Sequence, residues 1–337
     1  MSSKKLPAGK IPKELLSKYV FTCLGVEDER VIQGPLIGED AAVIDNGDKV
    51  LVVKANPITG AENKIGWLAV HINANDIAAR GAEPLWYLSI ILLPEEADEK
   101  LLKTIIQDQH KACKDLGICI VGGHTEVSPG LKRPIVAGFM LGEASKDRYV
   151  TTGGAEIGDH IVLTKGVGLE GTGILASDLK QLKKKVPKKV LSEAVKLLDL
   201  TSVVPEAKIA MQVGGVHSMH TPTEGGVLNG LLEVSEASGR GFIIYEDQLI
   251  VLEETRVICE ALEVDPLRLL SSGSLLIIVD PKYSDGLVEA LRSENIASKV
   301  IGEVTAESGT VVKVDGGVEL VESVEQDELF RILEEIT

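Results

Sequence analysis

The sequence predicts a mixed α/β (α+β) protein of two domains, and three observations lead to this prediction. Strand-like and helix-like segments alternate over residues 43–143 and again after Asp159. The stretch 142–159 between the two series is rich in Gly, Ser, Thr and charge, and it holds no apolar run longer than a pair. The length of 337 residues suits two domains of ordinary size. We therefore place the domains at residues 1–150 and 151–337.

The N-terminal elements follow from periodicity and from helix-ending residues. Apolar positions at helical spacing predict a helix over residues 64–80, which Gly81 ends and Pro84 prevents from continuing. The other expected elements are strands 41–44 and 50–53 around a turn at 45–48, strand 85–93, helix 95–116, and strands 118–121 and 135–141.

The C-terminal half predicts strands at 161–164, 241–244, 274–279 and 300–304, and helices at 172–176, 189–200, 223–238, 253–262 and 285–295. Thr221 and Glu224 fit a capping box, with Pro222 at the first helical position. Glycine costs roughly 1 kcal/mol inside a helix. Gly225 and Gly226 therefore suggest that another backbone or a ligand approaches closely.

Composition limits the class of partner. The chain has 35 basic and 51 acidic residues and a net charge of −16, which argues against nucleic acid or an anionic membrane surface. A small phosphorylated ligand stays possible, because backbone amides and a bound cation can hold it. The four cysteines form no CxxC pair, so a cytoplasmic protein with reduced thiols is expected. No secretory signal is seen, and no apolar run approaches the ~18 residues of a membrane span.

Polar clusters interrupt otherwise apolar segments of the first domain. Glu39 and Asp40 stand directly before a strand, where burial is costly unless a cation neutralises them; a solvated turn is the alternative. Asn73, Asn75 and Asp76 lie inside the predicted helix, although such residues are poor mid-helix formers. A polar outer face would also explain them, but the surrounding alanines and isoleucines favour a site.

Two strand ends carry further polar residues. Gly122 and Gly123 follow a strand and allow backbone N–H groups to face phosphate oxygens, with His124 as a further hydrogen-bonding group. Lys54 and Asn56 follow the strand 50–53, where a site would more often present a carboxylate. The role of Lys54 stays open between offsetting nearby carboxylates and pointing to solvent.

Taken in order, these clusters resemble the motifs of the superfamily of aminoimidazole ribonucleotide synthetase, the PurM-like proteins. The resemblance covers about residues 8–305, and in the second half it is closest to the hydrogenase maturation factor HypE. The segments that carry it are 38–42, 75–84, 122–125 with 129–130, 164–172, 219–226 and 265–274.

The resemblance implies a fold and a set of roles. The N-terminal domain would pack its sheet against a second subunit, giving a homodimer around a β-barrel-like core, beside a C-terminal α/β domain. ATP or another nucleotide would bind with its phosphates held by Mg²⁺, Ca²⁺ or Mn²⁺. The implied metal ligands are Glu39, Asp40, Asn56, Asp76 and Glu224, of which Asp40, Asp76 and Glu224 would be catalytic. The implied nucleotide-binding residues are Lys10, Asn73, Asn75, Gly122, Gly123, His124, Thr125 and Gly225.

The sequence departs from the family pattern in three places. Asn56 stands where the family has the aspartate of a Thr-Asp pair, so one negative charge is lost and Ca²⁺ could be favoured. HypE carries its substrate on a C-terminal cysteine, whereas the last cysteine here is Cys259, so the cyanide-forming reaction on such a tail is not expected. Thr221 stands where HypE has an aspartate, which weakens that side of the site.

These residues favour a divalent-metal-dependent phosphohydrolase acting on nucleotides or small phosphate esters. Two alternatives stay open. One is an ATP-dependent amide-activating enzyme like HypE and aminoimidazole ribonucleotide synthetase. The other is a nucleotide-binding accessory protein without catalysis, against which the joint presence of Asp40, Asp76 and Glu224 argues.

Overall fold

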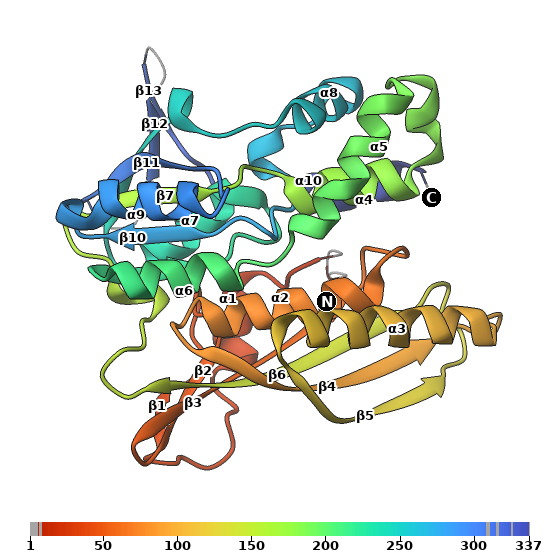
Figure 1. The fold of residues 1–337 in the computed structure, drawn as a ribbon, viewed down its shortest axis with the longest axis horizontal. Helices are drawn as coiled ribbons and strands as arrows, with labels where there is room; N and C mark the ends of the chain where they lie inside the picture. The colour runs from red at the N-terminus through yellow and green to blue at the C-terminus, as the bar shows by residue number, and fades with distance from the viewer. Residues whose placement is uncertain (1–5, 7–8, 308–310, 315–316, 325, 337) are drawn as a thin grey trace, which may run out of the picture.

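Two β-sheets organise the chain, one on each side of the polar stretch near residue 150, and helices lie between them (Figure 1). The computed structural model describes residues 6, 9–307, 311–314, 317–324 and 326–336. The last strand of the first sheet ends at Ser145, and the first strand of the second begins at His160. The predicted two-domain α/β architecture is confirmed.

The first sheet has six strands in the described residues, in the order β1-β2-β3-β6-β4-β5. All neighbours are antiparallel except β4 and β5. Helices α2 (Ile65–Ala78) and α3 (Glu99–Leu116) cover one face (Figure 1). The strands are β1 (Val31–Gln33), β2 (Ala42–Asn46), β3 (Lys49–Ile58), β4 (Glu83–Leu93), β5 (Cys119–Val127) and β6 (Ile135–Ser145).

Burial along the first sheet alternates because only one of its faces packs against helices. In β6, Val136 and Met140 are buried, whereas Phe139 and Leu141 between and beyond them are half-buried. The sheet is open within the chain, with β1 and β5 as its edges. A β-barrel-like core would therefore require a second copy, which stays a prediction.

Helix α2 lies between the first sheet and the second domain. Every residue of α2 except Trp67 is buried. The helix approaches β6 closely because β6 has glycines there: a Cβ added to Gly138 would lie 2.4 Å from Nδ2 of Asn73. Polar side chains on this helix must therefore find partners inside the protein.

The second sheet has seven strands in the described residues, in the order β13-β12-β9-β11-β7-β10-β8. Its strands are β7 (His160–Thr164), β8 (Val216–His220), β9 (Gly241–Tyr245), β10 (Leu276–Val279), β11 (Ser298–Thr305), β12 (Val311–Val314) and β13 (Val318–Leu320). The helices of this half are α4 (Leu169–Asp178), α5 (Lys188–Lys196), α6 (Val204–Val213), α7 (Gly226–Ser238), α8 (Glu253–Leu262), α9 (Pro281–Ser293) and α10 (Glu328–Ile336).

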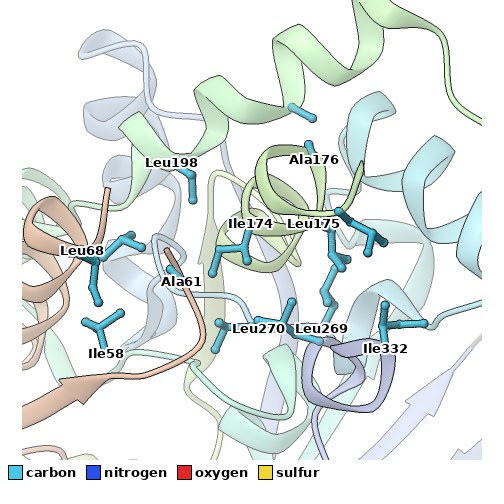
Figure 2. Close-up of a cluster of buried hydrophobic side chains, with 14 of the residues drawn as sticks. Ile58, Ala61, Leu68, Ile174, Leu175, Ala176, Leu198, Leu269, Leu270 and Ile332 are labelled. Atoms are coloured by element: carbon cyan, nitrogen blue, oxygen red, sulfur yellow. The ribbon is translucent and has the colours of Figure 1, made fainter. Parts of the chain in front are cut away.

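An apolar cluster joins the two halves (Figure 2). Ile58 and Leu68 of the first domain belong to the same buried cluster as Ile174 and Leu270 of the second. Ile332 of α10 belongs to it as well, so the C-terminal helix contributes to the junction. The two domains therefore share one hydrophobic core at their contact.

Several elements differ from the sequence prediction. The strands expected at 50–53 and 118–121 continue to Ile58 and Val127, so Lys54 and Asn56 lie within a strand rather than after it. Among the elements that were not predicted are β1, β8, β12, β13, α6 and α10. The expected capping box is wrong: α7 begins at Gly226 after Gly225 in the left-handed conformation. Thr221 instead donates to Asp76. None of the helices in the described ranges combines the length and apolar character that a bilayer span requires.

Candidate functional site

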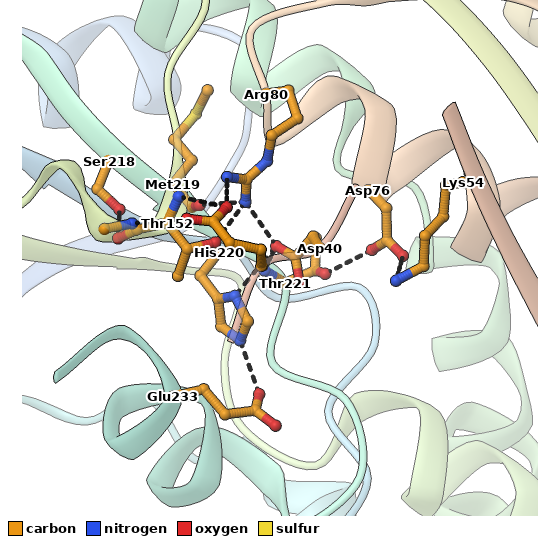
Figure 3. Close-up of polar contacts among 12 residues, drawn as sticks. Asp40, Lys54, Asp76, Arg80, Thr152, Ser218, Met219, His220, Thr221 and Glu233 are labelled. Atoms are coloured by element: carbon orange, nitrogen blue, oxygen red, sulfur yellow. Dashed lines mark hydrogen bonds and ion pairs between the residues drawn. The ribbon is translucent and has the colours of Figure 1, made fainter. Parts of the chain in front are cut away.

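A cluster of buried charged side chains lies where the two domains meet (Figure 3). The first domain supplies the N-terminal arm, the loop before β2, the middle of β3 and the end of α2 with the residues after it. The second supplies the end of β8, the loop that follows it and α7. We call this cluster the charged centre. It consists of Lys10, Glu39, Asp40, Lys54, Asp76, Arg80, His220, Thr221, Glu224 and Glu233.

Arg80 holds the two acidic residues that precede β2. Its side chain is fully buried, and its nitrogens lie 2.8 Å from Glu39 Oε2 and 2.9 Å from Asp40 Oδ2. It also donates to Thr152 Oγ1 at 2.6 Å and to the carbonyl of Met219 at 3.2 Å. The pair Glu39–Asp40 is therefore buried against a cation of the chain itself rather than placed in a solvated turn.

Asp76 lies at the end of α2 and receives donors on both carboxylate oxygens. Thr221 donates to Oδ1 at 2.7 Å, and Asn56 Nδ2 donates to Oδ2 at 2.7 Å. Lys54 Nζ lies 3.1 Å from the same Oδ2. Burial raises the pKa of Asp76, and Asp40 raises it further, whereas the Lys54 ammonium acts in the opposite direction.

His220 stands between two carboxylates. Its Nδ1 lies 3.0 Å from Asp40 Oδ2, and its Nε2 forms a 2.9 Å hydrogen bond with Glu233 Oε2. Burial alone would lower the pKa of His220, but the two facing carboxylates outweigh it and raise the pKa to about 9. The imidazole is therefore charged at neutral pH. Burial would raise the pKa of Asp40, yet His220, Arg80 and Lys54 together bring it below its ordinary range.

The N-terminal arm reaches the centre through Lys10. Its backbone N–H donates to Glu224 Oε2 at 3.0 Å, and its ammonium lies 3.1 Å from Glu233 Oε1. Burial would raise the pKa of Glu233, but Lys10 and His220 lower it to about 2. A Cβ on Gly9 would lie 3.5 Å from Glu224 and 3.9 Å from Phe330, so the arm passes between these residues.

Asn73 and Asn75 lie beside Asp76 on α2, but their amides bond to the backbone. Asn73 accepts from Asn56 N–H at 2.8 Å and donates to the carbonyls of Asn56 and Ala69. Asn75 donates to the carbonyl of Thr201 at 2.7 Å and accepts from Val203 N–H at 2.8 Å. Asn73 therefore fixes the end of β3, and Asn75 joins the two domains.

The predicted phosphate-binding glycines lie in different surroundings. Gly122, Gly123, His124 and Thr125 lie in the exposed edge strand β5, three strands away from β3 in the sheet. The structure therefore does not bring them to the charged centre of the same chain. Gly225 lies at the centre, where its N–H donates to Asp327 Oδ2 at 2.6 Å.

Sequence reasoning did not assign Arg80, His220, Glu233 or Asp327 to the site. A signal existed for Arg80, because this charged residue directly follows the apolar run 77–79 at the end of the predicted helix. His220 stands beside Thr221 in a segment already singled out, but no spacing rule marks its role. Glu233 and Asp327 lie in ordinary amphipathic patterns and gave no signal.

The four carboxylates predicted to bind metal are paired with donors of the chain itself, and Asn56 is one of these donors. Within the described residues, no group of three or more His, Cys, Asp or Glu side chains has an arrangement that could hold a metal ion. The ligand roles of Glu39, Asp40, Asn56, Asp76 and Glu224 stay predictions. Two surface hollows, of about 260 and 500 Å³, lie around Lys64 and Arg292, and neither includes a residue of the charged centre.

A two-domain α/β fold with a buried charged centre at the junction defines the class of this protein. Comparison with family models makes the assignment specific. The N-terminal domain of AIR synthase related proteins matches residues 38–144, and the C-terminal domain matches residues 156–315. The chain belongs to the AIR synthase related protein family.

Individual relatives cover most of the chain. A hydrogenase expression/formation protein of Methanocaldococcus jannaschii is 26% identical over 336 residues, which is 96% of this chain and 97% of that protein. The carbamoyl dehydratase HypE of Cupriavidus necator is 29% identical over 284 residues, which is 82% of this chain and 79% of that protein. A crystal structure of HypE in complex with ATP matches with a TM-score of 0.72 and 23% identity, covering 96% and 98% of the two chains.

The prediction of a phosphohydrolase is wrong. Of the relatives described above, the one whose reaction is stated is a carbamoyl dehydratase, not an enzyme that hydrolyses phosphate esters. The alternative of ATP-dependent amide activation agrees better with these relatives.

Proposed function

We propose that this chain is an enzyme that uses ATP to activate the oxygen of a carboxamide group. The observation that carries the proposal is the charged centre, in which Asp40 and Asp76 of one domain meet His220 and Thr221 of the other. The relatives add support, because one is a carbamoyl dehydratase and a HypE structure of the same fold was solved with ATP.

The proposed chemistry makes two demands on the protein. The amide oxygen forms a bond to the γ-phosphorus while the bond from that phosphorus to ADP breaks. Loss of the phosphate from a primary carboxamide, with both N–H protons passing to a base, then leaves a nitrile. The protein must therefore supply positive charge for the phosphates and a group that accepts protons.

The accessible side chains of the charged centre suit these roles. The Lys54 side chain is 21% exposed and that of Lys10 is 49% exposed, so both ammonium groups can contact a phosphate. Glu224 is partly exposed and accepts from Lys10 N–H through Oε2. We assign the lysines to phosphate binding and Glu224 to proton transfer. The arm carrying Lys10 must shift to admit ATP, because it lies against Glu224 and Phe330.

We also propose a homodimer formed through the first sheet. The face of this sheet away from α2 carries half-buried apolar residues such as Phe139 and Leu141. The edge strand β5 adds Val121 and Val127, which are 53% and 56% exposed. Such an apolar face and unpaired edge suit a second copy of the chain. Sedimentation equilibrium tests this: the wild type should sediment as a dimer and Val121→Lys as a monomer.

Turnover measurements test the proposed reaction. The full chain is incubated with ATP and Mg²⁺, alone and with primary carboxamides including S-carbamoylcysteine, and ADP is measured. We expect ADP formation that depends on a carboxamide and is lost in Glu224→Gln. ADP formation at the same rate without any carboxamide would contradict amide activation. Absence of ATP binding in calorimetry would contradict any ATP-dependent role, and ATP binding without turnover would favour the accessory alternative.

A further inference from the structure

We infer that the charged centre carries its own cations, because Arg80 and Lys54 occupy the place of a divalent cation between Glu39, Asp40 and Asp76. These carboxylates then hold no metal ion in the working protein. The inference deepens the proposed function in one respect: it assigns to lysine and arginine the positive charge that the family pattern assigns to metal.

Arg80 already lies against the first two of these carboxylates. Its guanidinium bridges Glu39 Oε2 and Asp40 Oδ2, and no part of its side chain is exposed. The backbone N–H groups of Thr152 and Gly153 lie 3.2 Å from Glu39 Oε2 and Oε1 respectively, so both oxygens of this carboxylate are occupied. A divalent cation needs about six oxygen ligands. It would have to displace the fully buried Arg80 guanidinium from both carboxylates.

Asp76, the third carboxylate, is likewise paired within the chain. Both of its oxygens receive donors, from Thr221 on one and from Asn56 and Lys54 on the other. Within β3 the chain has a neutral amide at position 56 and an ammonium group at position 54. This strand thus lacks one carboxylate of the family pattern and carries one cation. Electrostatic repulsion from Lys54 and Arg80 acts against a divalent ion beside Asp76.

The two cations differ in their exposure to solvent. Arg80 is sealed, so its charge serves only the carboxylates, whereas Lys54 is 21% exposed. Lys54 is therefore the fixed cation that can also face a phosphate group.

Metal titration tests the inference directly. Mn²⁺ is added to the metal-free full chain without nucleotide, and the free ion is followed by electron paramagnetic resonance. We expect no saturable binding to the wild type and one bound equivalent for the double variant Lys54→Ser/Asn56→Asp. Saturable wild-type binding that Asp76→Asn abolishes would overturn the inference. So would a double variant that gains no site.

The matched control is Lys49→Ser. Lys49 lies on the same strand and pairs with Glu143 at 2.5 Å outside the centre. This variant should bind no more Mn²⁺ than the wild type, which separates a new site from a general loss of positive charge.

Thermal unfolding supplies a second, independent readout. Arg80→Met should lower Tm, and Mn²⁺ should restore roughly 5 °C of the loss, because a ligand that binds only the folded state stabilises it. Lys165→Met is the control. Lys165 Nζ lies 2.6 Å from Oε1 of the buried Glu206, so this position holds a single carboxylate rather than a pair. The Tm of this variant should fall without recovery in Mn²⁺. Equal recovery of both variants, or of neither, would contradict the role inferred for Arg80.

The two proposals fail in different ways. Loss of carboxamide-dependent ADP formation bears on the reaction and leaves the Mn²⁺ titration unaffected. Tight Mn²⁺ binding by the wild type bears on the cations of the centre and leaves the reaction standing. Should Arg80→Met not fold, the titration of Lys54→Ser/Asn56→Asp still decides the inference.

Discussion

Arg80 and Lys54 both form ion pairs with carboxylates of the charged centre, yet their surroundings differ. Arg80 is completely buried and holds two carboxylates and a threonine hydroxyl, whereas Lys54 is partly exposed and holds one carboxylate that has other donors. The cost of removing a cation depends on whether water can replace it. The comparison therefore predicts that the sealed side of the centre determines stability and the open side determines ligand binding.

The largest effect is expected from Arg80→Met. The substitution leaves Glu39 and Asp40 buried without their shared cation, and such a loss typically costs about 3–5 kcal/mol. Urea unfolding should show this decrease in the free energy of unfolding without added metal. A decrease below about 1 kcal/mol, the value for exposed pairs, would mean that Arg80 is not sealed in solution.

A smaller effect on the sealed side is the pH dependence that comes from His220. Its pKa is raised from 6.5 to about 9, so the stabilisation is fully present below pH 6.5 and is lost as the pH rises through 9. The free energy of unfolding should change by on the order of 3 kcal/mol across this range. Unfolding free energies at pH 6 and pH 10 should differ by this much more for the wild type than for His220→Gln. If the wild type and His220→Gln showed the same difference between pH 6 and pH 10, the raised pKa would belong to a group other than His220.

On the open side, Lys54→Ser should leave stability within about 1 kcal/mol of the wild type. Asp76 keeps its donors Thr221 and Asn56 in this variant. ATP affinity should fall roughly tenfold, which corresponds to about 1.4 kcal/mol. Calorimetry measures the affinity, with Lys49→Ser as the control on the same strand. If Lys54→Ser lost much stability but kept its ATP affinity, Lys54 would belong to the side that determines stability and not to the side that binds ligand.

The smallest effect on stability is expected for Lys10→Ala. The Lys10 side chain is half exposed, and its pairing with Glu233 belongs to the class of ion pairs worth about 0–1 kcal/mol. ATP affinity should nevertheless decrease severalfold if the arm closes over the phosphates. Unchanged affinity in the same calorimetric assay would remove the arm from the binding site.

The sequence predicted elements well where periodicity and helix-ending residues agree. The helix expected at 64–80 is Ile65–Ala78, because apolar spacing and Gly81 give the same boundary. Strand β8 was missed because its residues, Val-His-Ser-Met-His, lack the apolar alternation of a half-buried strand. Strand β5 was predicted too short because Gly122 and Gly123 have low strand propensity, and pairing with β4 overrides that preference.

The site was predicted only in part, because a single sequence does not show which distant residues come together. Motif residues such as Asp40 and Asp76 stand out because carboxylates are unusual in apolar surroundings. Their partners come from far along the chain: Thr221 is 145 residues from Asp76, and Asn75 bonds 126 residues ahead to Thr201. Such pairings depend on how the domains dock, which local patterns do not encode. Lys54 was noticed as unusual, and its partner emerged only from the fold.

The amide of Asn75 has a consequence for how the chain reaches its folded state. In the folded protein this buried amide is satisfied by the carbonyl of Thr201 and the N–H of Val203, and Arg80 likewise uses Thr152 and Met219. A nascent chain that has emerged only to residue 150 has none of these partners, so water takes their place. The first domain gains these hydrogen bonds only after more than fifty further residues have left the ribosome. The last hydrogen bonds of the first domain therefore form when the second domain docks.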